Sequence, residues 1–129
     1  MLDARKAYSG FAVDDHERAK RFYGETLGLD VSVLDRGQQL LQLNVGEGQP
    51  ILIYTKPDYT PATYTILNFP VDDVDGVVDE LTARGVQFER YGGFDQDEKG
   101  IARGGEGRGP TIAWFTDPAG NVLAVHEDV

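Results

Sequence analysis

The sequence predicts an α+β fold in which two βαβββ modules form a cleft-bearing, curved mixed β-sheet with the helices on the outside. The first observation is an internal repeat, because the Phe-Ala-Val-Asp-Asp of residues 11–15 returns as Phe-Pro-Val-Asp-Asp at residues 69–73. The second is that helical spacing of apolar residues and then a glycine follow each copy. Such a repeat is typical of two modules that share one core and enclose a cleft. We therefore assign residues 1–58 to the first module and residues 59–129 to the second.

One helix is expected after each copy of the repeat. An aspartate stands at the capping position before each helix, and Gly28 and Gly85 stand where the helices should stop. Apolar residues recur at helical spacing between these signals. They are Ala19, Phe22, Tyr23 and Leu27 in the first helix and Val74, Val77, Val78 and Leu81 in the second.

The remaining apolar runs are short and bounded by turn formers, which is typical of strands. The last two runs are joined by Asp-Pro-Ala-Gly-Asn at residues 117–121, a composition that favours a turn. The predicted strands are 6–13, 30–33, 39–44 and 51–55 in the first module and 64–71, 86–90, 111–116 and 122–126 in the second.

Composition agrees with one compact unit, which is either one domain or two small halves packed together. With 129 residues, 40% of them hydrophobic, the chain is long enough to build a shared core. It has no cysteine, which excludes disulfides and zinc-thiolate sites. Its formal net charge of -10 disfavours nucleic acid, whose phosphates repel an acidic surface. Because it has no run of about 18 apolar residues and no signal-peptide pattern, we expect a soluble, cytoplasmic protein without membrane contact.

Several of these motifs together resemble the vicinal oxygen chelate superfamily, which includes glyoxalase I, bleomycin-resistance proteins and extradiol dioxygenases. The resemblance rests on the repeated Phe-x-Val-Asp-Asp, on Arg-Phe-Tyr at 21–23, on Leu-Gly-Leu at 27–29 and on the run 113–121. It covers essentially the whole chain and implies that the two modules form one domain of this type. It also implies a small organic ligand in the cleft and a homodimer.

The resemblance further implies four metal ligands, His, Gln or Glu, on the first and last strand of each module. The matching positions in this chain hold Tyr8, Ile66 and Ala124, and the fourth falls at or next to Leu52. Aliphatic side chains donate no lone pair, and a neutral tyrosine is a poor ligand for a divalent ion. We therefore predict neither a metal nor another cofactor.

Strand alternation predicts which side chains line the cleft. If Phe11 and Val13, and likewise Phe69 and Val71, pack under their helices, the residues between them face the other side. That side is apolar and aromatic with isolated polar groups, as in small-molecule pockets. Alternatively, these side chains merely fill the middle of the sheet. The candidate ligand-binding residues are Tyr8, Leu52, Tyr54, Ile66, Asn68, Trp114, Ala124 and His126, although alternation leaves open whether Trp114 or Phe115 faces the cleft.

The two histidines differ in their expected roles. His126 follows Ala124 on the cleft face, so it is the candidate general base or ligand contact, with an ordinary edge histidine as the alternative. Glu127 should alternate to the opposite face, so the pair should not chelate one ion. His16 lies among acidic residues in the first turn of a helix, where a solvated surface role is expected.

The glycine-rich segment 92–110 is long for a connection between strands. Such an insert is more often a lid or a binding loop than a simple connector. We expect it to cover the cleft, with Phe94, Asp95 and Arg103 as its candidate contact residues. A solvated hairpin loop is the alternative.

These observations support two functions of different classes. The first is a metal-independent small-molecule-binding protein of the glyoxalase/bleomycin-resistance type. The second is a metal-dependent lyase, isomerase or dioxygenase, for example lactoylglutathione lyase-like, with a non-standard metal site built from His126, Glu89, Asp95 or a partner subunit. A third possibility is a cleft without chemistry that serves only in a larger assembly.

Overall fold

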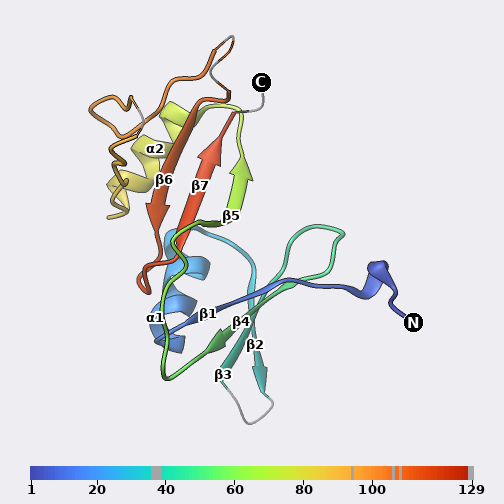
Figure 1. Cartoon of the computed structure of the whole chain (residues 1–129). Coiled ribbons are helices and arrows are strands. Elements are labelled where there is room, and N and C mark those ends of the chain that lie inside the picture. Colours follow the sequence, from blue (N-terminus) through green and yellow to red (C-terminus); the bar gives the residue numbers. More distant parts are fainter. Residues whose placement is uncertain (36–38, 94, 106, 108, 128–129) are drawn as a thin grey trace. The chain divides into compact units, whose positions relative to one another are not determined.

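The computed structural model divides into two compact units, Met1–Pro61 and Ala62–Val129, and each is described by itself (Figure 1). Their boundary falls shortly after the expected one between residues 58 and 59. The described residues are 1–35, 39–93, 95–105, 107 and 109–127.

The first unit contains a four-stranded mixed sheet and one helix. The strand order is β1-β4-β3-β2, with β1 parallel to β4 and the other neighbours antiparallel. A short 3-10 turn, Ala4–Lys6, precedes the sheet. The elements are β1 (Gly10–Val13), α1 (His16–Arg21), β2 (Val31–Asp35), β3 (Gln39–Leu43) and β4 (Ile51–Thr55).

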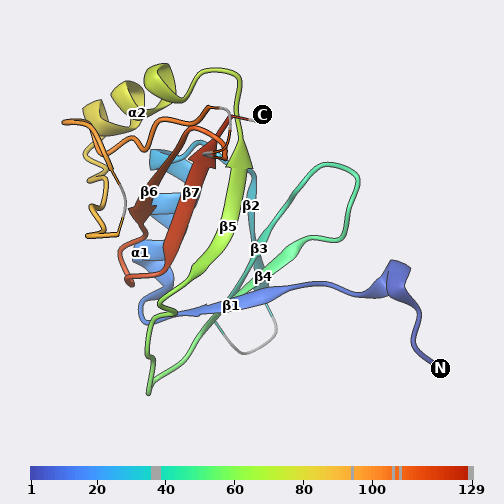
Figure 2. The same ribbon diagram turned by 45° about the horizontal axis from the view of Figure 1, so that its top comes forward.

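The second unit repeats this plan with a three-stranded sheet. The strand order is β5-β7-β6, with β5 parallel to β7 and β6 antiparallel to it. The helix α2 packs against β6 and β7. Figure 2 shows the described part of the segment that connects α2 to β6 beside these two elements. The elements are β5 (Thr65–Pro70), α2 (Val74–Ala83), β6 (Ile112–Thr116) and β7 (Val122–His126).

The α+β class with two βαβββ-like modules is confirmed, since each helix follows the first strand of its module and that strand runs parallel to the module's last strand. The described strands form two sheets, one for each module, where the sequence analysis expected one. Whether the modules share a cleft stays a prediction. No helix in the described part of the chain has the length and apolar character that a membrane crossing requires.

The helix signals predicted from the sequence are confirmed. Asp15 accepts a hydrogen bond from the Arg18 N–H (3.1 Å), and Asp73 accepts one from the Gly76 N–H (3.2 Å). Side-chain caps of this kind satisfy N–H groups that the first helical turn leaves unpaired. Gly85 ends α2 with φ of +94°, a conformation that residues with a Cβ rarely adopt.

The first helix widens beyond α1 into a π-helical turn, Phe22–Thr26. The Leu27 N–H donates to the Phe22 carbonyl across this turn (2.9 Å). Phe22 and Tyr23 are both buried, and the Tyr23 ring contacts both Phe22 and Phe11 at 5.2 and 5.7 Å between ring centres. The wide turn therefore brings two consecutive aromatic side chains into the core. Phe11 packs against Tyr23 of this turn, as predicted.

Two predicted strands differ from the structure. The 6–13 strand begins only at Gly10, and its first residue, Lys6, belongs to the 3-10 turn, where the Asp3 carboxylate accepts from the Arg5 N–H. The 86–90 strand is absent, and one bridge joins Phe88 to Phe115. The Glu89 N–H still donates to the Trp114 carbonyl, while the Gln96 amide accepts from the Tyr91 N–H and donates to the Glu89 carbonyl. A side chain thus satisfies backbone groups that a longer ladder would pair.

The β6–β7 connection confirms the predicted turn at 117–121. Asp117 is 4% exposed, and its carboxylate accepts from the backbone N–H groups of Ala119 and Asn121, both at 2.9 Å. The Asn121 amide donates to the same carboxylate at 3.0 Å. Burial of this carboxylate is tolerated because three donors satisfy it.

Candidate functional site

The sheet of the second unit separates Trp114 from Phe115. The Phe115 ring contacts Phe88 (5.5 Å between ring centres), and Phe88 lines a groove with Val78 and Thr82 of α2. Because successive side chains of a strand point to opposite faces, Trp114 lies on the face turned away from α2. We call this face, which carries Asn68, Trp114, Ala124 and His126, the distal face. The structure thus shows which ring lies on the α2 side, and whether Trp114 faces a cleft stays a prediction.

Register places three of the candidate residues in one row on the distal face. Asn68 of β5 is paired with Ala124 of β7, which is paired with Trp114 of β6. His126 stands in the next row, between Pro70 and Ile112. The structure therefore brings together four predicted residues from three strands.

Trp114 has an aromatic neighbour that the sequence analysis did not name. The Tyr91 ring meets the indole edge-on, 5.5 Å between ring centres and 77° between planes. Burial raises the pKa of the Tyr91 phenol, and the nearby Glu89 carboxylate adds to the rise. Glu89 also accepts a long hydrogen bond from the Thr116 hydroxyl (3.4 Å). Strand alternation could have placed Glu89 and Tyr91 on the distal face, because both differ from Phe88 by an odd number of residues and Phe88 faces α2.

The pair His126 and Glu127 splits across the sheet, as the sequence predicted. The Glu127 carboxylate accepts from the Val74 N–H (2.8 Å) at the start of α2, on the face opposite His126. Glu127 is therefore a second cap of α2. His126 is half-buried on the distal face.

The first unit places two candidate residues on one sheet face. Leu52 and Tyr54 alternate with Ile53, which is completely buried, whereas Tyr54 is 38% exposed. Leu52 is paired with Gly10, where an added Cβ would stand 3.1 Å from the Leu52 carbonyl oxygen. This strand pair therefore needs glycine or a local shift. Tyr8 precedes β1 and is 65% exposed.

Ile66 is the candidate that strand alternation fails to place. The β5–β7 register shifts between Thr65 and Leu67, so Ile66 is an extra residue without a partner on β7. A bulge of this kind breaks the two-residue period of a strand. Counting back from Val71 therefore does not establish the direction of the Ile66 side chain.

The residues present do not fit the divalent metal that the superfamily resemblance implies. Among the described residues, no three His, Asp or Glu side chains gather closely enough to hold an ion. Glu89 bonds to Thr116 at one end of β6, and His126 is paired with Ile112 at the other. Four residues of strand separate these points by about 13 Å. Two of the donors suggested for a displaced site, His126 and Glu89, thus lie apart.

The predicted lid residues lie in differing surroundings. Phe94 is outside the described residues, and Asp95 is exposed. Arg103 pairs with Asp75 of α2 at 2.8 Å and with Asp97 at 2.7 Å. The Arg103 hydrogen bond lowers the pKa of Asp75, and the two carboxylates raise the pKa of Arg103. These bonds tie the segment to α2, and its role as a lid stays a prediction.

His16 is not the solvated side chain that the sequence suggested. Its side chain is 11% exposed, and its Nδ1 is buried without a hydrogen-bond partner in the described part of the chain. Nε2 lies 3.8 Å from a Glu17 carboxylate oxygen. Local acidity in the sequence did not reveal this burial, because burial depends on what packs over the helix.

The family profile of the Glyoxalase/Bleomycin resistance protein/Dioxygenase superfamily matches residues 7–125. The chain therefore belongs to this superfamily. No curated protein matches it.

Solved structures of the same fold cover nearly the whole chain. A superfamily member from Sphaerobacter thermophilus is 24% identical over 99% of this chain and 100% of its own, with a TM-score of 0.70. A glyoxalase family protein from Enterococcus faecalis is 23% identical over 97% of both chains, with a TM-score of 0.65. TnmS3, an antibiotic-binding protein from a Streptomyces species, is 25% identical over 99% of this chain and 100% of its own, with a TM-score of 0.68.

Proposed function

We propose that this protein binds a small, planar organic molecule without a metal ion and that the distal face of the second unit contacts it. The observation that carries the proposal is the edge-on pair of Tyr91 and Trp114 on this face. Two further findings support it. The donor set does not fit a metal, and a structural relative of similar length is an antibiotic-binding protein.

The chemistry of the distal face suits a flat ligand with a polar edge. Aromatic rings favour stacked or edge-on contacts with other rings. Because Trp114 is 9% exposed, Tyr91 is the more accessible ring of the pair. Asn68, two strands away at about 10 Å, offers an amide donor and acceptor. Ala124 between them adds no bulk beyond a methyl group.

The other predicted contacts stay part of the proposal. Leu52 and Tyr54 share one sheet face in the first unit and are candidates for the apolar lining of the site. Tyr8 and Ile66 remain candidates from the superfamily resemblance, as do the lid residues. His126 would hold a polar group of the ligand or act as a base beside it.

The single tryptophan of the chain allows a direct binding test. Planar aromatic compounds, including antibiotics, are titrated against chelator-treated protein, and quenching of Trp114 fluorescence is followed. Tyr91→Ala should weaken binding about fivefold, since aromatic contacts contribute about 1 kcal/mol beyond buried area. Tyr64→Ala is the matched control, because Tyr64 is 70% exposed.

Two results would refute the proposal. One is binding that requires added nickel, zinc, manganese or iron, which would favour the metal-dependent lyase, isomerase or dioxygenase instead. The other is an equal effect of Tyr91→Ala and Tyr64→Ala. Elemental analysis of the purified protein supplies the metal content for the first comparison.

The homodimer and the cytoplasmic location are proposed alongside this function. The superfamily resemblance supports the dimer, and symmetric dimers are the commonest assembly of soluble proteins. Light scattering during size-exclusion chromatography measures the mass directly. A mass near the 14.2 kDa of one chain would contradict the dimer.

A further inference from the structure

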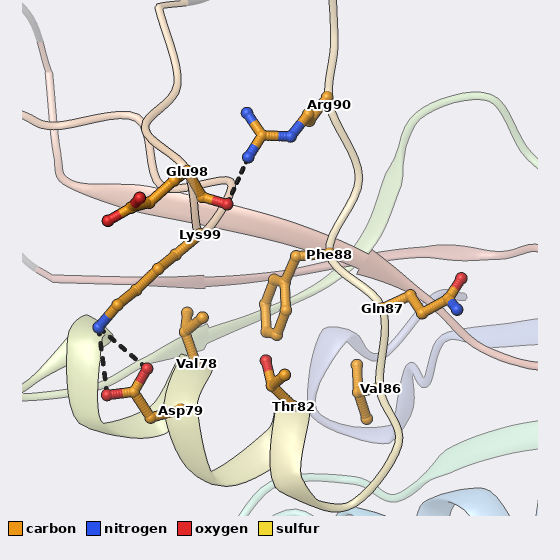
Figure 3. Close-up of a pocket in the computed structure, with 9 residues that line it drawn as sticks. All are labelled: Val78, Asp79, Thr82, Val86, Gln87, Phe88, Arg90, Glu98 and Lys99. Carbon is orange, nitrogen blue, oxygen red and sulfur yellow. Dashed lines mark hydrogen bonds and ion pairs between the residues drawn. The ribbon is translucent and has the colours of Figure 1, made fainter.

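A groove of about 480 Å³ lies in the second unit beside α2 (Figure 3). Its volume falls in the range of small-molecule sites. Three segments form it, namely α2, the segment 86–90 and the loop residues 98–99. The lining residues are Val78, Asp79, Thr82, Val86, Gln87, Phe88, Arg90, Glu98 and Lys99.

The groove has an apolar floor held in place by core contacts. Val78 is 1% and Val86 6% exposed, and both belong to the buried core. The Phe88 ring stands above them and is fixed by its contact with Phe115. On the loop side, an added Cβ at Gly100 would lie 3.2 Å from the Phe88 Cβ, so loop and ring approach closely. The floor is therefore built by packing.

The two cations of the groove differ in their partners. Lys99 is paired with Asp79 at 2.9 Å, so a carboxylate compensates its charge. Arg90 donates from Nη2 to the Glu98 carbonyl, which carries no formal charge, and no carboxylate pairs with Arg90 among the described residues. Figure 3 shows the Glu98 carboxylate turned away from this guanidinium. Arg90 thus brings an uncompensated positive charge to one end of the apolar floor.

We propose that this groove binds an amphipathic monocarboxylate, with the carboxylate on Arg90 and the hydrocarbon part on Val78, Val86 and Phe88. A guanidinium presents several N–H donors in a fixed plane and matches a carboxylate in two-point contacts. The net charge of -10 repels anions at long range. Local contacts with Arg90 and with the floor therefore have to supply the affinity.

This site is separate from the one in the proposed function. Phe88 faces α2, whereas its neighbour Glu89 bonds to Thr116 and Tyr91 contacts Trp114 on the distal face. The two sites therefore lie on opposite faces of the same sheet. Loss of one binding activity leaves the other intact.

The test is a titration of the full-length, ¹⁵N-labelled protein with octanoate, followed by NMR. We expect the backbone amides of 86–90 and 98–99 to shift. Arg90→Gln should weaken octanoate binding about tenfold or more, because it removes a charge-assisted hydrogen bond. Arg90→Lys, which keeps the charge but loses the planar fork, should weaken it less. Octylammonium, which has the same chain and the opposite charge, should bind more weakly than octanoate.

Arg84→Gln is the matched control. Arg84 follows α2 and pairs with Glu80 at 2.7 Å, outside the residues that line the groove, so octanoate affinity should change less than about twofold. The proposal is overturned if octanoate shifts none of the groove amides, if Arg90→Gln binds as tightly as the parent, or if octylammonium binds equally well. An unchanged spectrum away from the groove shows that each variant is folded.

Discussion

The two units follow the same strand plan but differ at its outer strand. In the first unit β2 pairs with β3 over five register positions, from Val31 with Leu43 to Asp35 with Gln39. In the second unit the corresponding segment makes one bridge, between Phe88 and Phe115. The described residues between it and β6 form isolated bridges and no named strand. A module of this type therefore tolerates the loss of an outer strand when other contacts hold the edge.

Side chains supply those other contacts in the second unit. Gln96 makes three hydrogen bonds to backbone groups, those of Tyr91, Glu89 and Gly100, at 2.7 to 2.9 Å. Arg103 and Lys99 add ion pairs to α2. The first unit is stabilised at this edge by a ladder, whereas the second is stabilised by a few specific residues. Single substitutions should therefore affect the second edge more.

The largest effect is expected for Gly104→Ala. An added Cβ there would lie 2.4 Å from the Thr111 nitrogen and 2.5 Å from the Gly109 oxygen, which are backbone atoms with little freedom to move. We expect a loss of about 3 kcal/mol or more in the free energy of unfolding, measured by urea denaturation. Gly93→Ala is the control, since among the described residues, its chain neighbours aside, nothing lies within 4 Å of its added Cβ. Equal midpoints for the two variants would contradict this prediction.

The second prediction compares the two outer edges directly. Phe88→Ala removes a half-buried ring from Phe115 and should cost about 2 kcal/mol. Val33→Ala, on β2, removes a side chain that is 50% exposed and should cost less than about 1 kcal/mol. Thermal and urea unfolding of both variants give the comparison. If Val33→Ala costs as much as Phe88→Ala, the edges do not differ as described.

The third prediction concerns the helix starts. Glu127→Ala removes one of the two caps of α2 and should cost about 1 kcal/mol, as lost caps commonly do. Asp15→Ala at α1 should cost a similar amount. The double variant Asp73→Ala with Glu127→Ala should cost more than either single change. If urea unfolding shows no loss of stability for Glu127→Ala, the Val74 N–H is hydrogen-bonded to water instead.

The smallest effect is expected at the ion pairs of the loop. Burial opposes ionisation of Asp97, but hydrogen bonds from Ile101, Arg103 and Lys99 outweigh it and lower its pKa, and the Arg103 hydrogen bond lowers the pKa of Asp75. A lowered folded-state pKa gives stability that is present above the unfolded pKa of about 4 and is lost as the pH falls through the folded value.

Hydrogen exchange of the Ala102 amide measures how far these ion pairs stabilise the loop. The Ala102 N–H donates to the Ile112 carbonyl, and Ala102 is the neighbour of Arg103. Protection, corrected for the intrinsic rate, should fall below pH 4 in the parent protein. Arg103→Gln should lower it already at pH 6, while Arg5→Gln, at an exposed arginine that pairs with Asp3, should leave it unchanged. Equal protection in the parent and in Arg103→Gln would show that the ion pairs do not hold the loop.

Sequence was sufficient where the signals are local. The caps Asp15 and Asp73 and the turn at Asp117 depend on neighbours a few residues away, and all three form as predicted. Sequence failed where a side chain outside the strand pattern bonds to its backbone. The Gln96 side chain bonds to backbone groups at and just after the predicted strand 86–90. The apolar pattern of residues 86–90 does not indicate such a contact.

The candidate site likewise contains features that the sequence pattern predicted and features that it did not. Alternation grouped Asn68, Ala124 and His126 correctly on one face. It did not place Trp114, because alternation within one strand gives relative phase, and the side is fixed by the pairing of Trp114 with Ala124 and by the contact of Phe115 with Phe88. It also misses the bulge at Ile66, since an extra residue in one strand leaves no mark in composition.

The π-helical turn at Phe22–Thr26 gives the two modules different tolerance to changes in chain length. Its closing bond joins Leu27 to Phe22 and spans one residue more than an α-helical bond. Deleting one residue there would leave an ordinary helical turn between the same end points. In α2, which is α-helical from Val74 to Ala83, a deletion would rotate every later side chain by about 100°. The first helix should therefore tolerate deletion of one residue in its π-helical turn, whereas α2 should not tolerate a deletion.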